Sequence, residues 1–214
     1  MLGALLNHKL DPILYRIAKA IHGLINPNYL TFIGFLINGG AAVLLALGLW
    51  KVAGAAVLLG GLFDMLDGAV ARAQGRVTPF GAFFDSVMDR YSDSVLLMGI
   101  IFFYAYSSRP SLVMLATVAT IGSLLVPFAR ARAETVIPSC KVGIMERPER
   151  VILIAAGAVF DWMVPVLWIL TVLTHVTVIQ RILYTRQKLR GASLPASGPP
   201  QQASEPTPSQ EDER

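Results

Sequence analysis

Four aspartates lie close together in a part of the chain that is otherwise strongly apolar: Asp64, Asp67, Asp85 and Asp89. On helices the first pair, three residues apart, and the second pair, four residues apart, would each share one face. Carboxylates that converge in a low-dielectric pocket cannot all stay ionised unless cations compensate them, and Mg²⁺ prefers such oxygen ligands. Two bound metal ions would suit a displacement at phosphorus. The spacing favours metal-assisted chemistry, while a structural cluster, a proton relay or an ion pathway remain alternatives.

The bulk composition indicates a membrane protein. Of the 214 residues, 54% are apolar and only 15% are Asp, Glu, Lys or Arg, and the mean hydropathy is +0.58. A soluble domain carries about 25% charged residues, so the deficit points to a lipid environment. The single cysteine, Cys140, excludes an internal disulfide and has no Cys or His neighbour at metal-ligand spacing.

We expect an all-α integral membrane protein with six transmembrane helices, because a span needs about 20 mostly apolar residues. Pro27 and Asn28 mark the start of the first span, and Asp161 and Pro165 mark a break between the last two. The expected spans are residues 30–50, 52–74, 80–106 and 110–134, followed by two within 147–184.

The aspartates fall at the end of the second span and the start of the third. The segment between the two pairs contains Gly75, Pro79 and Gly81, which predict a turn that reverses the chain. The two helices would then run antiparallel, so that the two pairs of carboxylates face one another.

The ends of the chain have a different character from the six spans at 29–190. Residues 1–28 contain apolar residues at helical spacing between basic ones, which predicts an amphipathic helix lying at the membrane interface. Residues 191–214 are rich in Pro, Ser and Gln and almost devoid of large apolar side chains. Such a tail buries too little surface to fold, so we expect it to be disordered.

Basic residues predict the orientation of the protein in the cell membrane. If the N-terminus is cytoplasmic, the outer loops hold only Lys51 and Arg109. Cytoplasmic loops are usually the ones enriched in Lys and Arg. This topology places all four aspartates at the cytoplasmic ends of spans.

Residues 64–89 also resemble a known signature, because they read D-x2-D-G-x2-A-R-x8-G-x3-D-x3-D. The pattern is similar to that of the CDP-alcohol phosphotransferases, whose six-span outline agrees as well. The resemblance covers roughly residues 10–190. The eight matching positions are Asp64, Asp67, Gly68, Ala71, Arg72, Gly81, Asp85 and Asp89.

The resemblance implies transfer of a phosphatidyl-type group from a CDP-linked lipid to an alcohol, with release of CMP. It also implies two divalent ions, Mg²⁺ or Mn²⁺, and a homodimer. Asp64, Asp67 and Asp85 would hold one ion, and Asp64, Asp85 and Asp89 the other. Asp89 would also be the general base that accepts the proton of the attacking alcohol.

The same resemblance implies a binding site for the CDP-lipid. Gly68 would let the nucleotide approach the backbone, and Arg72 would pair with a phosphate, which its planar guanidinium does well. The positions of Thr78 and of the entry to the first span, Pro27, Asn28 and Thr31, resemble those that line the nucleotide pocket. Helix capping by Thr78 and Asn28 is the alternative interpretation.

Three later segments resemble the bacterial phosphatidylinositol-phosphate synthases and related archaeal enzymes: A-R-A-E at 131–134, G-x-x-E-R-x-E-R at 143–150 and Q-R at 180–181. In that group, three basic residues form a pocket for the phosphate of the acceptor. The matching residues are Arg130, where the group often has Lys, Arg147 and Arg181. The alternative is that some of these arginines only set topology and contact lipid headgroups.

Other charged residues extend these motifs. Asp93 lies one turn beyond Asp89, where it would orient a ligand or pair with Arg90. Three glutamates are interleaved with the basic residues and are candidate partners for them: Glu134, Glu146 and Glu149.

We therefore expect an enzyme that makes phosphatidylinositol phosphate from CDP-diacylglycerol and inositol 1-phosphate. Glycerol 3-phosphate is the alternative acceptor, and a divalent-cation transporter is the alternative from another class. Transport is disfavoured because the aspartates sit at one membrane end and no inverted repeat mirrors them. The expected partners are the lipid bilayer and a second copy of the chain, and no nucleic acid.

Overall fold

The computed structural model describes residues 26–191, which form six helices. The interfacial helix predicted for 1–28 and the disordered tail predicted for 191–214 fall almost entirely outside this range and stay predictions. The helices are α2 (Pro27–Ala46), α3 (Trp50–Ala73), α4 (Pro79–Tyr106), α5 (Pro110–Ala133), α6 (Arg147–Val159) and α7 (Met163–Gly191).

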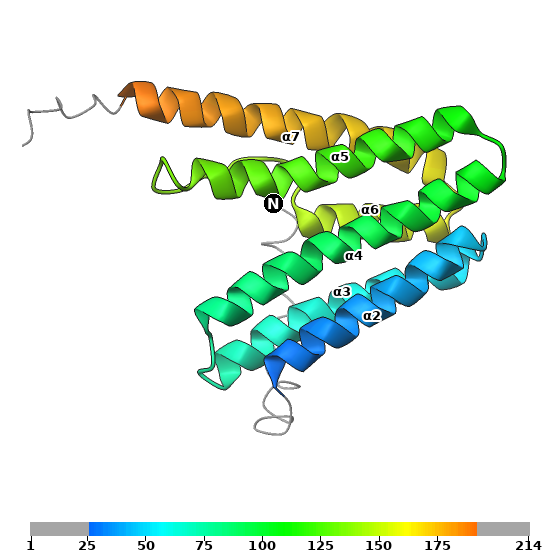
Figure 1. Ribbon diagram of the computed structural model, residues 1–214, viewed down its shortest axis with the longest axis horizontal. Helices are drawn as coiled ribbons and strands as arrows, with labels where there is room; N and C mark the ends of the chain where they lie inside the picture. The colour runs from blue at the N-terminus through cyan, green and yellow to red at the C-terminus, as the bar shows by residue number, and fades with distance from the viewer. Residues whose placement is uncertain (1–25, 192–214) are drawn as a thin grey trace, which may run out of the picture.

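Successive helices run antiparallel and lie roughly along one common direction (Figure 1). Helix α2 packs against α3 and α4, α5 packs against α7, and α6 contacts both α3 and α7. The starts of α2, α4 and α6 and the ends of α3, α5 and α7 therefore gather at one end of the bundle, which we call the site end. All four aspartates lie toward it, as the antiparallel arrangement of 52–74 and 80–106 predicted.

The all-helical class is confirmed, and the bundle is that of a multi-pass membrane protein. Four helices are long and apolar enough to cross a membrane: α2, α3, α5 and α7. Helix α4 has 28 residues but carries four charged residues between positions 85 and 93: Asp85, Asp89, Arg90 and Asp93. Helix α6 has only 13 residues, fewer than the roughly 20 that a span requires. Spanning by these two helices therefore stays a prediction.

The outer surface of the helices is apolar. Leu58 and Leu59 on α3, Trp168 and Val172 on α7 and Phe102 on α4 are each about half exposed. A soluble protein rarely exposes so much contiguous apolar surface. These side chains instead suit contact with lipid chains.

Local signals explain where the helices begin and end. Prolines stand at the first turn of α2, α4, α5 and α6, where the missing N–H costs no hydrogen bond. Helix α2 ends at Ala46, earlier than the predicted residue 50, because Gly48 turns the chain with a φ of 76°. The break expected near Asp161 falls at residues 160–162, where Asp161 has a φ of 57°.

Candidate functional site

Two cavities lie at the site end, and α4 contributes to the lining of both. The smaller, the α2–α4 cavity, has a volume of about 270 Å³ and is formed by the first turns of α2 and α4 and the last turns of α3. The larger, the α4–α7 cavity, has a volume of about 440 Å³ and is formed by α4, α5, α7 and the start of α6. Asp85 lines the first and Asp89 the second, one helical turn apart.

The α2–α4 cavity brings together every residue predicted to contact the CDP-lipid. They are joined there by two of the predicted metal ligands, Asp67 and Asp85. The six predicted contact residues are Pro27, Asn28, Thr31, Gly68, Arg72 and Thr78.

Two polar side chains in this cavity have well-defined partners. The hydroxyl of Thr31, buried on α2, donates to Oδ2 of Asp67 at 2.5 Å. The hydroxyl of Thr78 accepts from the backbone N–H of Gly81 at 3.0 Å and caps α4. Capping by Thr78 is thus confirmed, although the residue also lines the cavity. Capping by Asn28 is wrong, because the cap of α2 is Asn26, whose side chain accepts from the backbone of Asn28.

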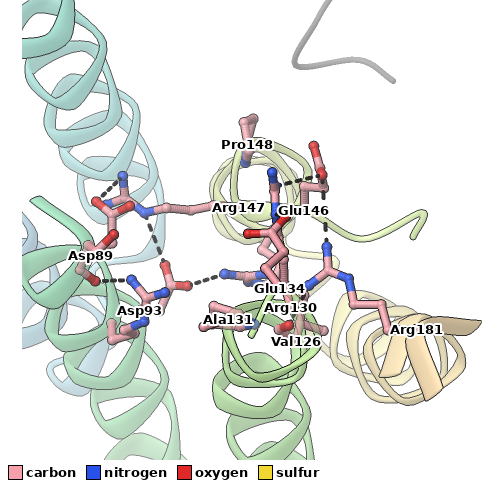
Figure 2. Close-up of a pocket in the computed structure, with 14 residues that line it drawn as sticks. Asp89, Asp93, Val126, Arg130, Ala131, Glu134, Glu146, Arg147, Pro148 and Arg181 are labelled. Carbon is pink, nitrogen blue, oxygen red and sulfur yellow. Dashed lines mark hydrogen bonds and ion pairs between the residues drawn. The ribbon is translucent and has the colours of Figure 1, made fainter. Parts of the chain in front are cut away.

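The α4–α7 cavity brings together the three arginines predicted to bind the acceptor phosphate. Figure 2 shows Arg147 on α6 reaching toward Asp89 on α4, and the carboxylate of Glu146 lying between Arg130 and Arg181. These residues come from four helices that are far apart in the sequence.

Arg147 bridges two of the predicted metal ligands. Its Nη2 donates to Oδ2 of Asp64 at 2.7 Å, and its Nη1 lies 2.7 Å from Oδ1 of Asp89. The second contact is an ion pair by distance but lacks hydrogen-bond geometry, so the buried Oδ1 of Asp89 has no hydrogen-bond partner. Sequence reasoning placed Arg147 in the acceptor pocket and did not predict that it would contact the aspartates.

This arrangement bears on the metal prediction. Within residues 26–191, no three Asp, Glu, His or Cys side chains are arranged so that they would hold a metal ion, and the guanidinium of Arg147 contacts both Asp64 and Asp89. The donors nevertheless fit a hard divalent cation, since all are carboxylate oxygens and one buried oxygen, Oδ1 of Asp89, lacks a hydrogen bond. The aspartates as ligands, and the number of ions, stay predictions.

One glycine that sequence reasoning missed positions Asp64. Gly34 of α2 lies so close to α3 that a Cβ atom there would be 2.6 Å from Oδ1 of Asp64. Any larger residue would push the carboxylate out of place. The signal in the sequence was weak, because a glycine in an apolar helix is also explained by ordinary helix packing.

Arg130 is held by two acidic side chains, as the interleaved glutamates suggested. Its Nε donates to Oε1 of Glu134 at 3.1 Å, and its Nη1 lies 3.7 Å from Oε1 of Glu146. Glu134 also accepts from the backbone N–H of Cys140, and this hydrogen bond, together with Arg130, holds the pKa of Glu134 below its usual value.

Arg181 is almost fully buried, with 2% of its side chain exposed. Its Nε donates to the carbonyl of Val142 at 2.9 Å, and its Nη1 donates to the carbonyl of Val126. Its Nη2 lies 3.9 Å from Glu146 and faces the cavity. The hydrogen-bond partners of Arg181 are therefore backbone carbonyls.

Comparison with known proteins identifies the family of the chain. The family model for CDP-alcohol phosphatidyltransferase matches residues 24–183. The archaetidylinositol phosphate synthase of Methanothermobacter thermautotrophicus is 35% identical over 187 residues, which cover 85% of this chain and 90% of that protein.

Solved structures give the same result. The crystal structure of Mycobacterium tuberculosis phosphatidylinositol phosphate synthase with CDP-DAG bound has 30% sequence identity and a TM-score of 0.75, and covers 81% of this chain and 94% of the other. The structure of that enzyme in complex with manganese and citrate has a TM-score of 0.74 at 30% identity, and covers 81% and 88% of the two chains.

The family match and the similarity to these structures therefore show that the protein is a transferase of phospholipid biosynthesis. The chain belongs to the CDP-alcohol phosphatidyltransferase family.

Proposed function

We propose that the protein transfers the phosphatidyl group of CDP-diacylglycerol to inositol 1-phosphate and releases CMP. The observation that carries the proposal is the pair of neighbouring cavities. Residues predicted for the CDP-lipid line one cavity, and arginines predicted for a phosphate line the other, with Asp85 and Asp89 between them on α4. The mycobacterial phosphatidylinositol phosphate synthase has CDP-DAG bound in its crystal structure, and the archaeal relative is an archaetidylinositol phosphate synthase, which supports the choice.

In the proposed reaction, the hydroxyl oxygen of the acceptor forms a bond to the phosphorus that carries the diacylglycerol. The bond from that phosphorus to the bridging oxygen of the diphosphate breaks, and CMP leaves with this oxygen. Asp89 faces the acceptor cavity and takes the proton of the attacking hydroxyl. In the neighbouring cavity, Arg72 pairs with a phosphate oxygen of the CDP-lipid.

Two Mg²⁺ or Mn²⁺ ions held by Asp64, Asp67, Asp85 and Asp89 would neutralise the diphosphate and stabilise the leaving CMP. Manganese in the related mycobacterial structure supports a divalent ion. The chain itself brings the aspartates of α3 and α4 together at the site end. Gly34, which has no Cβ, leaves room for the carboxylate of Asp64.

The acceptor phosphate is the feature that selects the substrate. The contacts of Glu146 with Arg130 and Arg181, at 3.7 and 3.9 Å, are longer than hydrogen bonds. A phosphate that enters the cavity would replace these contacts with charge-assisted hydrogen bonds. An acceptor without a phosphate, such as free inositol, offers no such compensation to the arginines.

We further propose six membrane spans, a homodimer and a cytoplasmic site end. The orientation rests on the basic residues, because among the described residues only Lys51 and Arg109 lie at the opposite end. A cytoplasmic site would face the soluble acceptor.

The test is an acceptor screen with purified protein in liposomes that contain CDP-diacylglycerol and Mg²⁺. The proposal predicts CMP release with inositol 1-phosphate, and none without acceptor, without metal or with free inositol. Release with glycerol 3-phosphate but not with inositol 1-phosphate would assign the alternative acceptor. Absence of CMP with every phosphorylated alcohol would refute the proposed function.

A further inference from the structure

A buried ion pair next to the acceptor cavity has no part in the chemistry described so far. Nη2 of Arg150 on α6 lies 2.5 Å from Oδ2 of Asp93 on α4. Asp93 is 5% exposed and Arg150 is 4% exposed. Both line the α4–α7 cavity.

The pair helps to fix the start of α6. Nη1 of Arg150 donates to the carbonyl of Met145 at 3.3 Å, so the same side chain also ties down the segment that precedes the helix. The backbone N–H of Met145 in turn donates to the hydroxyl of Thr177 on α7 at 3.1 Å. The start of α6 is therefore held from α4 on one side and from α7 on the other.

Arg147 is the first residue of α6, so its direction depends on these contacts. Oδ1 of Asp93 lies 3.7 Å from Nε of Arg147, while the two terminal nitrogens of the guanidinium face Asp64 and Asp89. Figure 2 shows Asp93 and Asp89 on one wall of the cavity, with Arg147 reaching toward both. One carboxylate, Asp93, thus contacts Arg147 directly and also holds the helix that carries it.

Burial of such a pair is not explained by stability. Two buried charges lose more free energy on desolvation than they regain from their mutual attraction unless the geometry is excellent. Apolar side chains of similar volume often stabilise a protein at least as well. The specific direction that the pair imposes is the property that apolar packing would not provide. Arg147 has a long side chain with much rotational freedom, and holding it in place lowers the entropy cost of binding a phosphate.

We propose that Asp93 and Arg150 form a positioning pair that sets the orientation of Arg147 and thereby the affinity for the phosphate of the acceptor. The inference rests on the proposed function and deepens it. Neither residue is assigned a role as metal ligand or base. The pair acts only through the start of α6 and through Arg147.

The test measures KM for both substrates in Asp93→Asn and Arg150→Gln. Each change should raise the KM for inositol 1-phosphate about tenfold or more and leave the KM for CDP-diacylglycerol within about twofold. Arg150→Lys, which keeps the charge, should recover part of the loss. Arg109→Gln, at the far end of the bundle, is the control and should change neither KM.

The double variant Asp93→Asn/Arg150→Gln keeps the test decisive if a single variant fails to fold, because it leaves no unpaired buried charge. It should raise the KM for inositol 1-phosphate no more than the larger single effect, since the two residues act as one unit. An unchanged KM for the acceptor, or equal rises in both KM values, would overturn the proposal.

A binding measurement separates this inference from the proposed function. Isothermal titration of the purified protein with inositol 1-phosphate should give a Kd at least about tenfold weaker in the double variant than in the wild type. If the wild type releases CMP but the double variant binds and turns over inositol 1-phosphate normally, only the positioning role fails. If the wild type neither binds inositol 1-phosphate nor releases CMP with it, the acceptor assignment fails. The positioning role then fails as well, because it rests on that assignment.

Discussion

The two cavities differ in how they are built. The α2–α4 cavity takes its lining from 27–31 and from 67–85, two short stretches of neighbouring helices. The α4–α7 cavity takes its lining from residues between 86 and 181, on four helices. Most residues that line the first cavity therefore lie within the motif at 64–89. The second exists only when distant helices pack together.

The two cavities also differ in charge. Among the described residues, two aspartates and two arginines line the α2–α4 cavity. Five arginines and four acidic residues line the α4–α7 cavity, and most of these charges are already paired with one another. A substrate that enters the second cavity must therefore compete with existing ion pairs. This difference suggests that the acceptor side is the more sensitive to small displacements.

Loss of the base should have the largest effect, because Asp89 stands at the boundary of the two cavities. Asp89→Asn should lower kcat by about 100-fold to 10,000-fold, the usual contribution of a general base, while CDP-diacylglycerol still binds. The measurement is CMP release together with CDP-lipid binding. Asp161→Asn is the matched control, because Asp161 lies at the opposite end of the bundle and Asn tolerates its positive φ. A normal kcat in Asp89→Asn would refute the base role.

Substitution of one arginine in each cavity should raise the KM for one substrate and not for the other. Arg72→Gln should raise the KM for CDP-diacylglycerol, and Arg130→Gln the KM for inositol 1-phosphate, each by about 10-fold to 100-fold, since a charge-assisted hydrogen bond contributes about 1.5–3 kcal/mol. In each variant the other KM should change little.

The control for Arg130 is Arg132→Gln, two residues further along α5 and exposed. Arg132 does not appear among the residues that line either cavity. If both arginine variants raised both KM values alike, the cavities would not be separate binding sites.

Arg181 should differ from Arg130 because most of its hydrogen bonds go to the backbone. Arg181→Met would leave the carbonyls of Val126 and Val142 without this donor, which costs about 1–3 kcal/mol for a buried group. We expect a lower Tm as well as a higher KM for the acceptor, whereas Arg130→Gln should leave Tm almost unchanged. An unchanged Tm in Arg181→Met would show that its role is confined to the ligand.

The smallest effect should come from Thr78 in the α2–α4 cavity. Thr78→Ala removes the cap of α4 and should cost about 1 kcal/mol of stability, seen as a modest fall in Tm. Thr78→Ser keeps the cap and should behave as wild type. A rise in the KM for CDP-diacylglycerol in Thr78→Ala at unchanged Tm would instead indicate a direct contact with the nucleotide.

Much of the fold was predictable because its signals are local. Apolar length and helix-start prolines located six helices, with ends that differ from the predicted ones by up to seven residues, as at Gly191, where residue 184 was predicted. The spans themselves were harder to predict. The break at 160–162 was predicted, but it leaves α6 with only 13 residues, fewer than the roughly 20 that a span requires.

The sequence by itself determined the faces of the aspartates, because these depend on helical periodicity and one turn. Its resemblance to the CDP-alcohol phosphotransferases implied the six residues predicted for the CDP-lipid, and these lie together in the α2–α4 cavity. Only the tertiary structure decided the partners of the arginines. Arg147 meets Asp64 across 83 residues of sequence, and Arg150 meets Asp93 across 57. Such contacts depend on how helices pack, and a long charged side chain among several opposite charges pairs with whichever carboxylate the packing brings near.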